Sequence, residues 1–520
     1  MPLYLQIQEY NMKAETKYKG SLKLAAIGDA LGWMTEFEKS KDSLKKKFGT
    51  TYINSFHDWE KNVGGRFYGY IDKLNSGSYS DDTQLLLSVA RSIDKDGFVD
   101  QQYFAKKELP NWLLYSRGAG RTIKNAARKI ERKSARWNNN FFTFKAGKTT
   151  IDYRESGANG AAMRILPIAL ANFGEPDKIK EEIFGNSIIT HGHPRAILGA
   201  MLYGYSVDTI LRFNPENFNY TNFLTELGKD IHQKFAINFL DNPKLKSWET
   251  EWNKNSKEPF RVLFKSIVDE TQEYLRTTYK LITNNSSDFD ALTKLGCYKN
   301  ETKGSGTSTV IAGIYLACKY SKEPLKGIEQ AVNSIGTDTD SIAAFAGGLI
   351  GALHGQSIIP SKWKNVQDLD YIDAISIRLL QISESRAEFK KIINTKNTKS
   401  ISEIENDSFE INERVFLETL GEGRIEAIDR QKTLTKGKYN LILDVQFEIG
   451  QFCRFAKMLN IDKEGKSDLF TENIENEVNL LDGLNLDYKS KERIEKFMES
   501  LNETNKKEFK EIIKFIEKRV

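Results

Sequence analysis

The chain of 520 residues is poor in cysteine and proline, and each of these scarcities restricts the kind of protein that it can be. Its three cysteines, Cys297, Cys318 and Cys453, lie far apart without CxxC spacing, which argues against a structural zinc site and favours a reducing compartment. Only 10 prolines stand against 36 glycines, so the composition favours long helices separated by glycine-containing loops. No apolar run reaches the roughly 20 residues of a membrane-spanning helix, and we expect no membrane partner.

Charge of one sign is also scarce. The net charge of +5 is small for this length and does not by itself argue for nucleic-acid or membrane binding. Hydrophobic residues make up 39% and charged residues 28%, as in a soluble globular protein with a sizeable core. The length allows two or three domains, or one large helical domain with an appendage. The N-terminal segment MPLYLQIQEYNMK has no basic stretch followed by an apolar one, so we expect no signal peptide and a cytoplasmic protein.

What the chain does contain is an acidic segment in front of an apolar one, SIGTDTDSIAAFAGGLIGALHG, at residues 334–355. Residues 342–353 are almost wholly apolar or small, which predicts a helix buried on all sides. Asp338 and Asp340, with Ser341 beside them, then lie at the N-terminal end of that helix. Two carboxylates there repel each other and resist desolvation. The helix dipole and capping hydrogen bonds offset part of this repulsion, and a bound cation would offset the rest.

A second acidic helix start, SDDTQLLLSVARSI, occupies residues 80–93. Ser80 can cap the helix, and Asp81 and Asp82 complement its positive end. The apolar stripe behind them consists of Leu85, Leu86, Val89 and Ile93. Ordinary capping explains this segment when it is taken alone. Two such starts in one chain, each with paired aspartates and a hydroxyl residue, weaken the capping explanation and leave a cation site as the alternative.

The ligand chemistry indicates which cation to expect. Carboxylates and hydroxyls without cysteine or paired histidines favour a hard cation with oxygen ligands, magnesium before zinc. Two such clusters could hold two ions close together, orient substrate oxygens and activate a water at neutral pH. Isoprenoid synthases also bind magnesium in all-helical sites, but they need DDxxD spacing, which neither cluster has.

Three further segments combine small residues with polar ones. Residues 18–36 predict a tightly packed helix that carries Asp29 and opens into a loop at Glu36, and an ordinary core helix is the simplest interpretation. Residues 156–170, SGANGAAMRILPIAL, predict a glycine turn that either lets backbone approach a ligand or only connects two elements. His191 precedes another apolar helix, which is a mild hint of function.

Residues 117–136, RGAGRTIKNAARKIERKSAR, are densely basic. A solvated helix face is the commonest meaning of such a run. The GAG loop at its start could instead present backbone amides to a phosphate. The run and the C-terminal tail could also form a docking surface for a larger target. Residues 137–155 show no clear period and predict an exposed loop.

The composition of the sequence changes near residue 397, where polar residues without periodicity predict a domain boundary. We therefore expect two parts, residues 1–397 and residues 398–520. In the second part residues 441–459 are amphipathic, and helical spacing relates Phe509, Ile512, Ile513, Ile516 and Val520. These patterns predict a small helical appendage, whose sequence indicates no chemistry.

Five motifs occur in the order found in ADP-ribosylglycohydrolases. They are GDALGWMTE at 28–36, YSDDTQ at 79–84, GANGAAMR at 157–164, THGHP at 190–194 and GTDTDSIAAFAGGLIGALHG at 336–355. Each motif is weak alone, but five in order, with both acidic ones intact, are highly specific. Over about residues 18–395 the chain resembles the dinitrogenase-reductase-activating type most, with ADP-ribosyl-arginine and ADP-ribosyl-serine hydrolases as relatives.

The resemblance implies an all-α, orthogonal multi-helix domain that binds two magnesium ions, or manganese in their place. The implied metal ligands are Ser80, Asp81, Asp82, Asp338, Asp340 and Ser341. Glu36 aligns with a glutamate next to the scissile bond and is implied as general acid or base, with Asp338 as the second catalytic residue. The implied ADP-ribose groove is lined by Gly120, Ala158, Asn159, Gly160 and His191.

The implied reaction hydrolyses the glycosidic bond between ADP-ribose and a modified acceptor, with an ADP-ribosylated arginine side chain as first choice. The ions would hold the distal ribose while a metal-bound water attacks its anomeric carbon, so that metal replaces one carboxylate of the usual glycosidase pair. The alternatives are a module that binds ADP-ribose without turnover, and a hydrolase of ADP-ribosylated nucleic acid or of a small ADP-ribosyl compound.

The chain departs from the family pattern at three places. Thr337 stands where a second glycine is usual, the turn reads GANG rather than GNG, and Ser341 stands where threonine is also common. None of these departures removes an implied metal ligand. They concern substrate preference more than activity.

Overall fold

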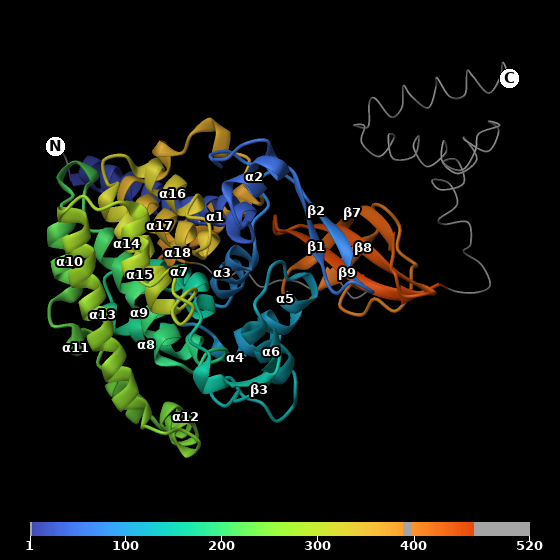
Figure 1. The fold of residues 1–520 in the computed structure, drawn as a ribbon, viewed down its shortest axis with the longest axis horizontal. Coiled ribbons are helices and arrows are strands. Elements are labelled where there is room, and N and C mark those ends of the chain that lie inside the picture. The colour runs from blue at the N-terminus through green and yellow to red at the C-terminus, as the bar shows by residue number, and fades with distance from the viewer. Residues whose placement is uncertain (1–2, 388–397, 462–520) are drawn as a thin grey trace.

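The computed structural model describes residues 3–387 and 398–461, with side chains from residue 13 onward. Figure 1 shows a large helical body and, beside it, a sheet built from the C-terminal part of the described chain. The helices are α1 (Leu3–Glu36), α2 (Lys41–Phe48), α3 (Asp81–Arg91), α4 (Gln101–Tyr103), α5 (Leu109–Tyr115), α6 (Arg121–Ile130), α7 (Leu166–Ala171), α8 (Pro176–Ser187), α9 (Pro194–Ile210), α10 (Tyr220–Gly228), α11 (Ile231–Lys234), α12 (Pro243–Lys254), α13 (Phe260–Thr283), α14 (Asp288–Lys294), α15 (Gly306–Lys319), α16 (Pro324–Val332), α17 (Thr339–His354) and α18 (Leu369–Ser383).

The centre of the body is a pair of helices that are distant in sequence, α1 and α17. Their backbones touch, because each helix presents glycine to the other. A Cβ on Gly28 would lie 2.2 Å from the carbonyl oxygen of Ala343, and a Cβ on Gly32 would lie 2.5 Å from the Cα of Asp340. Only glycine allows so close an approach. The contact at Gly32 places Glu36, one turn further along α1, beside the start of α17.

The remaining helices enclose this pair. Helices α9, α15 and α16 pack on α17, and α18 packs on α1. Residues 339–353 of α17 are all buried, as the apolar stretch predicts. Helix α3 begins directly after its cap Ser80, and α9 follows His193. The helical prediction is therefore confirmed for the body.

Two β-hairpins interrupt the helices. In the first, β1 (Trp59–Val63) pairs antiparallel with β2 (Tyr70–Leu74); in the second, β3 (Thr143–Ala146) pairs with β4 (Thr149–Asp152). The prediction of an exposed loop over residues 137–155 is wrong at the second hairpin. Its strands are short and largely exposed, so the sequence there lacks the alternation of apolar residues that marks a half-buried strand.

The described part of the appendage is a sheet, so the chain is not purely all-α. Its strands are β5 (Lys399–Ser400), β6 (Arg414–Leu417), β7 (Gly421–Lys432), β8 (Lys438–Phe447) and β9 (Phe452–Asn460), in that order across the sheet. Strand β5 runs parallel to β6, and the other neighbours are antiparallel. In β8 the apolar Leu441, Leu443 and Val445 recur at every second residue, which is the period of a strand.

The helical spacing of Phe509 to Val520 lies outside the described residues, so it stays a prediction. The division of the chain at residue 397 also stays a prediction. Among the described residues, no helix combines the length and the apolar character that a membrane crossing needs.

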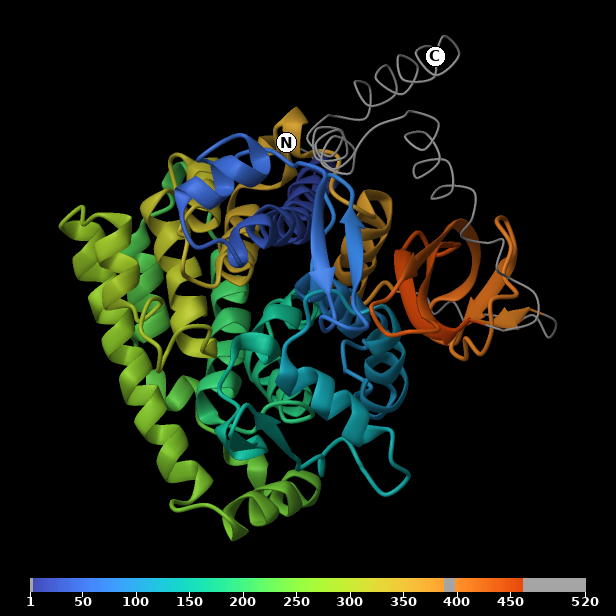
Figure 2. The same ribbon diagram turned by 45° about the vertical axis from the view of Figure 1, so that its right-hand side comes forward.

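The sheet packs on the body through the β1–β2 hairpin and α5, and Figure 2 shows the hairpin between the two. Arg454 of β9 forms ion pairs with Asp72 of β2 (2.7 Å) and with Asp444 of β8 (2.6 Å). The Phe452 backbone amide donates to Asp368, just before α18 (3.0 Å). The sheet is thus bound to the body by buried polar contacts as well as by apolar packing.

Candidate functional site

The start of α17 brings its aspartates to the end of α1. Carboxylate oxygens of Glu36, Asp338 and Asp340 lie within 4.8 Å of one another, and such a group could hold a metal ion. Two threonines hold the helix ends together, with a hydrogen bond of 3.0 Å between the hydroxyls of Thr35 and Thr339. Because Thr35 precedes Glu36 and Thr339 separates the two aspartates, this bond fixes the spacing of the three carboxylates.

Asp29, on α1, holds the second acidic segment in place. Its carboxylate accepts hydrogen bonds from the Ser80 amide (3.1 Å), the Thr83 amide (3.0 Å) and the Thr83 hydroxyl (2.6 Å). The Ser80 hydroxyl in turn caps α3 by accepting from the Asp82 amide (3.2 Å). Asp29 is fully buried. It is therefore an anchor for the SDD segment rather than an ordinary core residue.

The two acidic segments meet. The Ser341 hydroxyl donates to the Asp82 carboxylate over 2.7 Å, although 259 positions separate the two residues. The predicted ligands Asp81, Asp82, Asp340 and Ser341 are all less than a tenth exposed. Hereafter the acidic cluster means Glu36, Ser80, Asp81, Asp82, Asp338, Asp340 and Ser341.

Burial and mutual repulsion make ionisation of these carboxyl groups unfavourable. Burial, with the nearby charge of Asp338 next in size, raises the pKa of Glu36 to about 8. Burial and the charge of Asp29 raise the pKa of Asp81 to about 7. Burial also raises the pKa values of Asp82 and Asp340 well above their usual range, and the next largest cause is the charge of Asp29 for Asp82 and the charge of Glu36 for Asp340. The protein's own groups thus leave the negative charge largely uncompensated, and a bound divalent cation would compensate it.

One cation approaches the acidic cluster from the β1–β2 hairpin. Lys61 is attracted by Glu36, Asp340 and Asp81, although burial is the larger effect and lowers its pKa. Its ammonium nitrogen lies 3.7 Å from the centre of the Phe37 ring and 5.0 Å from that of Trp33. Among the described residues it has no hydrogen-bond partner. A single ammonium neutralises only part of the acidic cluster.

The GANG turn adjoins the acidic cluster. The Asn159 side-chain amide donates to the Asp338 carboxylate (3.1 Å). The Asn159 backbone amide donates to the carbonyl of Gly304 (2.9 Å), while Ala158 forms a β-bridge with Ser305. Gly304 itself faces Asp338, because a Cβ there would lie 3.0 Å from the carboxylate. Asn159 and Asp338, predicted for different roles, are thus in direct contact.

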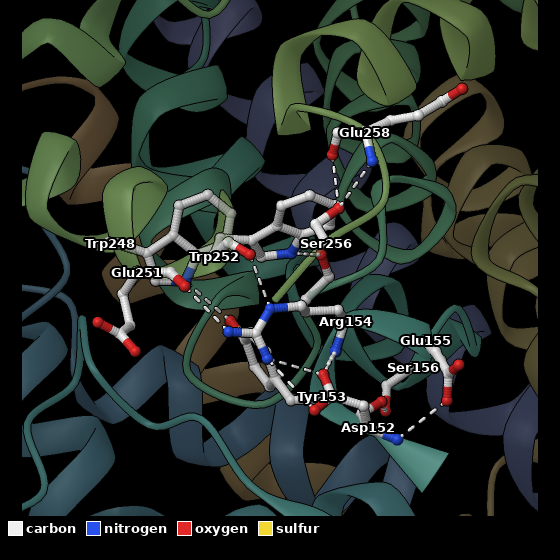
Figure 3. Close-up of polar contacts among 11 residues, drawn as sticks. Asp152, Tyr153, Arg154, Glu155, Ser156, Trp248, Glu251, Trp252, Ser256 and Glu258 are labelled. Atoms are coloured by element: carbon white, nitrogen blue, oxygen red, sulfur yellow. Dashed lines mark hydrogen bonds and ion pairs between the residues drawn. The ribbon is translucent and has the colours of Figure 1, made fainter. Parts of the chain in front are cut away.

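The segment before the turn is anchored by Arg154, as Figure 3 shows. Its guanidinium donates to the carbonyl oxygens of Trp252 (2.8 Å) and Glu251 (2.9 Å) and pairs with Asp152 (2.9 Å). The neighbouring Tyr153 hydroxyl accepts from the indole nitrogen of Trp248 (3.0 Å). Helix α12 therefore holds the start of the turn in place.

The other predicted groove residues have different surroundings. His191 packs against Gly160, since a Cβ on Gly160 would lie 2.8 Å from its ring. The imidazole is buried and contacts the Thr190 hydroxyl (2.8 Å), and burial lowers the pKa of His191 to about 3, so it is neutral. Gly120 caps α6, and a Cβ there would meet nothing within 4 Å. The contribution of these residues to a ligand groove stays a prediction.

The donor set fits a hard cation. The acidic cluster consists of carboxylate and hydroxyl oxygens, which magnesium prefers, and contains neither thiolate nor imidazole. The Ser341 hydroxyl already donates to the Asp82 carboxylate, and the pKa values of four of the carboxyl groups are raised. The arrangement can hold a divalent ion next to a carboxyl group that keeps or releases a proton near neutral pH.

The chain is similar to known proteins over most of its length. The model of a family described as ADP-ribosylglycohydrolase matches residues 11–388. The chain is 26% identical to the ADP-ribosyl-dinitrogen reductase glycohydrolase of Rhodospirillum rubrum, over 66% of this chain and 87% of that protein. It is 24% identical to the ADP-ribosylhydrolase ARH3 of Xenopus tropicalis, over 67% and 90%. It is 22% identical to the ADP-ribosylarginine hydrolase Tri1 of Serratia proteamaculans, over 67% and 74%.

A solved structure titled "ADP-ribosylglycohydrolase-related protein complex" also matches. It covers 72% of this chain and 99% of its own, with 18% identity and a TM-score of 0.43.

Proposed function

The chain belongs to the ADP-ribosylglycohydrolase family, and on that premise we propose that it is a magnesium-dependent hydrolase that removes ADP-ribose from a modified acceptor. An ADP-ribosylated arginine side chain is the first choice of acceptor, because relatives named for arginine and for dinitrogen reductase are among the matches. The observation that carries the proposal is the hydrogen bond between Ser341 and Asp82, which joins the two acidic segments into one cluster.

The cation would be held by the predicted ligands of the acidic cluster, which are Ser80, Asp81, Asp82, Asp338, Asp340 and Ser341. A magnesium ion in such a site supplies a Lewis acid that orients sugar hydroxyls and lowers the pKa of water. Asp29 and the Thr35–Thr339 pair keep the ligands in place, because each bonds to a residue beside them. Asn159 would fix the orientation of Asp338 through its bond to the carboxylate.

Glu36 would move the proton. The reaction consumes one water, whose hydroxyl ends on the anomeric carbon of the ribose while a proton ends on the acceptor atom. Without a bound cation, burial and then the charge of Asp338 raise the pKa of Glu36 to about 8, which favours a proton on this carboxyl group that it would donate to the departing acceptor. The proton from the water then restores the carboxyl group. The nearby Lys61 ammonium would stabilise Glu36 in the interval when it is ionised.

The test measures release of ADP-ribose from ADP-ribosyl-arginine, ADP-ribosyl-serine and an ADP-ribosylated oligonucleotide, in magnesium and in a chelator. We expect release from at least one substrate in magnesium and none in the chelator. Glu36→Gln keeps the shape of the side chain but cannot donate the proton, so kcat should fall by about 100-fold or more. Glu15→Gln is the matched control, because Glu15 lies on the same helix in a partly exposed ion pair with Lys19 (2.6 Å).

No release from any of the three substrates would contradict the proposal, and so would full activity in Glu36→Gln. Tight binding of ADP-ribose without turnover would instead identify a binding module.

A further inference from the structure

A densely basic surface begins next to the acidic cluster, and the proposed chemistry does not use it. It is formed by α6, the turn after it and the β3–β4 hairpin. We define the basic surface as Arg121, Lys124, Arg128, Lys129, Arg132, Lys133, Arg136, Lys145 and Lys148. From residue 109 to residue 151 the only acidic residue is Glu131. Since the net charge of the whole chain is only +5, this is a local concentration of positive charge.

The cations of the basic surface lack intramolecular partners. In the described part of the chain, none of their side chains has a carboxylate within 4.0 Å, and none takes part in a hydrogen bond that would hold it. Some cations on other helices do pair, as Lys180 does with Asp177 (2.8 Å) and Lys254 with Glu251 (2.6 Å). Unpaired like charges on one helix face repel each other. A polyanionic ligand would remove that repulsion.

The position of the basic surface relates it to the acidic cluster. Gly118, at the start of the loop that leads into α6, faces Asp81, because a Cβ there would lie 3.1 Å from its carboxylate. Lys124, one turn into α6, is attracted by Asp81 and repelled by Arg128. Figure 1 shows α6 beside β3, so the helix that carries Lys124 and Arg128 leads from Gly118 toward the second hairpin.

The size of the basic surface exceeds what ADP-ribose needs. A helix rises about 1.5 Å per residue, so α6 alone, with 10 residues, is roughly 15 Å long. A diphosphate carries only two phosphate groups, whereas nucleic-acid strands carry one phosphate per about 3.4 Å in a duplex. A row of this length would meet several consecutive phosphates.

We propose that the basic surface binds the backbone of a single-stranded nucleic acid that carries the ADP-ribose as its acceptor strand. The proposal rests on the proposed hydrolysis at the acidic cluster, and it names a single-stranded nucleic acid as the acceptor in place of the arginine side chain that the names of the relatives favour. A single strand is preferred to a duplex, because a base or end buried in a duplex stack cannot present its modification to a buried site without being extruded. An acidic protein is the competing acceptor, but nine cations with Glu131 as the one acidic residue among them match a phosphate backbone better than a surface with scattered carboxylates.

The first measurement is binding of an unmodified single-stranded oligonucleotide by fluorescence anisotropy. The variant Arg128→Glu/Lys133→Glu/Arg136→Glu reverses three exposed charges. We expect at least about tenfold weaker binding and a salt-dependence slope smaller by about 2, since each lost phosphate contact contributes about 0.7. The control Lys265→Glu/Lys294→Glu/Lys322→Glu reverses three exposed lysines on α13, α14 and the turn before α16, and should bind like the parent. The neutral variant with glutamine at positions 128, 133 and 136 should give an intermediate affinity.

The second measurement is kcat/KM on an ADP-ribosylated oligonucleotide and on ADP-ribosyl-arginine. The triple reversal should lower the first by at least about tenfold and leave the second unchanged. Unchanged oligonucleotide binding in the reversal variant, or binding that does not respond to salt, would overturn the proposal. If the triple reversal lowered kcat/KM only for an ADP-ribosylated acidic protein, the result would overturn the proposal in favour of a protein acceptor. Because the binding measurement needs no turnover, an inactive enzyme contradicts the proposed function without affecting this result.

Discussion

At the scale of single residues, the carboxyl groups of the acidic cluster repel one another when ionised, and the other side chains that the structure describes do not fully neutralise them. Glu36, Asp81, Asp82 and Asp340 all have raised pKa values, and burial is the largest cause for each. Helices α1, α3 and α17 nevertheless hold them together by packing and by threonine and serine hydrogen bonds. The cluster is therefore built for a positive ligand rather than for stability.

This repulsion predicts how the stability of the metal-free protein depends on pH. Glu36 holds its proton up to about pH 8 in the folded chain but loses it near its usual pKa of 4.5 when unfolded. The folded state therefore binds more protons between these values, and rising pH favours unfolding. In a chelator, the midpoint of thermal unfolding should fall as pH rises from 5 to 8. Added magnesium should stabilise the protein more at pH 8 than at pH 5, and an equal effect at both would contradict this account.

The sequence identified most of the acidic cluster but not what supports it. Paired aspartates before apolar helices can be recognised locally, since charge and period are local properties. The meeting of Asp82 and Ser341 was implied only by a family resemblance, because no spacing rule relates positions 259 apart. Lys61 was not predicted at all, because its place depends on how a short hairpin packs.

At the scale of elements, the contact between α1 and α17 sets the geometry of the site. Gly32 contacts the backbone of Asp340, and Glu36 lies one turn further along α1, beside the start of α17. A side chain at Gly32 would push the two helices apart and separate Glu36 from Asp340.

We therefore predict that Gly32→Ala lowers the free energy of unfolding by about 1–3 kcal/mol and reduces activity more than Glu15→Gln does. The comparison is Gly228→Ala, at the end of α10, where the nearest atom to a new Cβ is 3.9 Å away. That substitution should be neutral or stabilising, since alanine favours a helix by about 1 kcal/mol over glycine. Chemical denaturation measures both variants. Equal stabilities would show that α1 and α17 can move apart freely.

The described part of the appendage shows where element prediction fails. The amphipathic residues 441–459 and the helical spacing of the tail predict a helical appendage, which is wrong for 441–459 because these residues form β8 and β9. Leu441, Leu443 and Val445 follow period 2, and Gly450 has a φ of 99°, which turns the chain between β8 and β9. Both signals are local and favour a hairpin.

At the scale of the whole molecule, the sheet contacts the same parts of the body that position the acidic cluster, namely the β1–β2 hairpin and the segment before α3. Arg454 of β9 holds Asp72 of β2, and the same hairpin carries Lys61 toward the acidic cluster. Phe452 bonds to Asp368, which also accepts a hydrogen bond from Tyr79, the residue before Ser80. Loss of the sheet would therefore affect both the hairpin and the start of α3.

Arg454→Met should test this attachment. It leaves the carboxylate of Asp72, which is 2% exposed, without its ion-pair partner, and should lower the free energy of unfolding by about 3 kcal/mol. Arg414→Met removes the ion pairs of an exposed arginine with Glu448 (2.9 Å) and Glu422 (3.5 Å) and should change the free energy of unfolding by less than about 0.5 kcal/mol. A single unfolding transition is expected in the parent protein. Equal effects of the two substitutions would show that the sheet is only loosely attached.

The most direct test of the central claim is a crystal structure with manganese in place of magnesium and ADP-ribose added. Anomalous scattering locates manganese without reference to any prior interpretation. We predict anomalous density in contact with Asp82, Asp338 and Asp340, next to the distal ribose of the ligand. Manganese elsewhere on the surface, or ADP-ribose bound away from these carboxylates, would contradict the account.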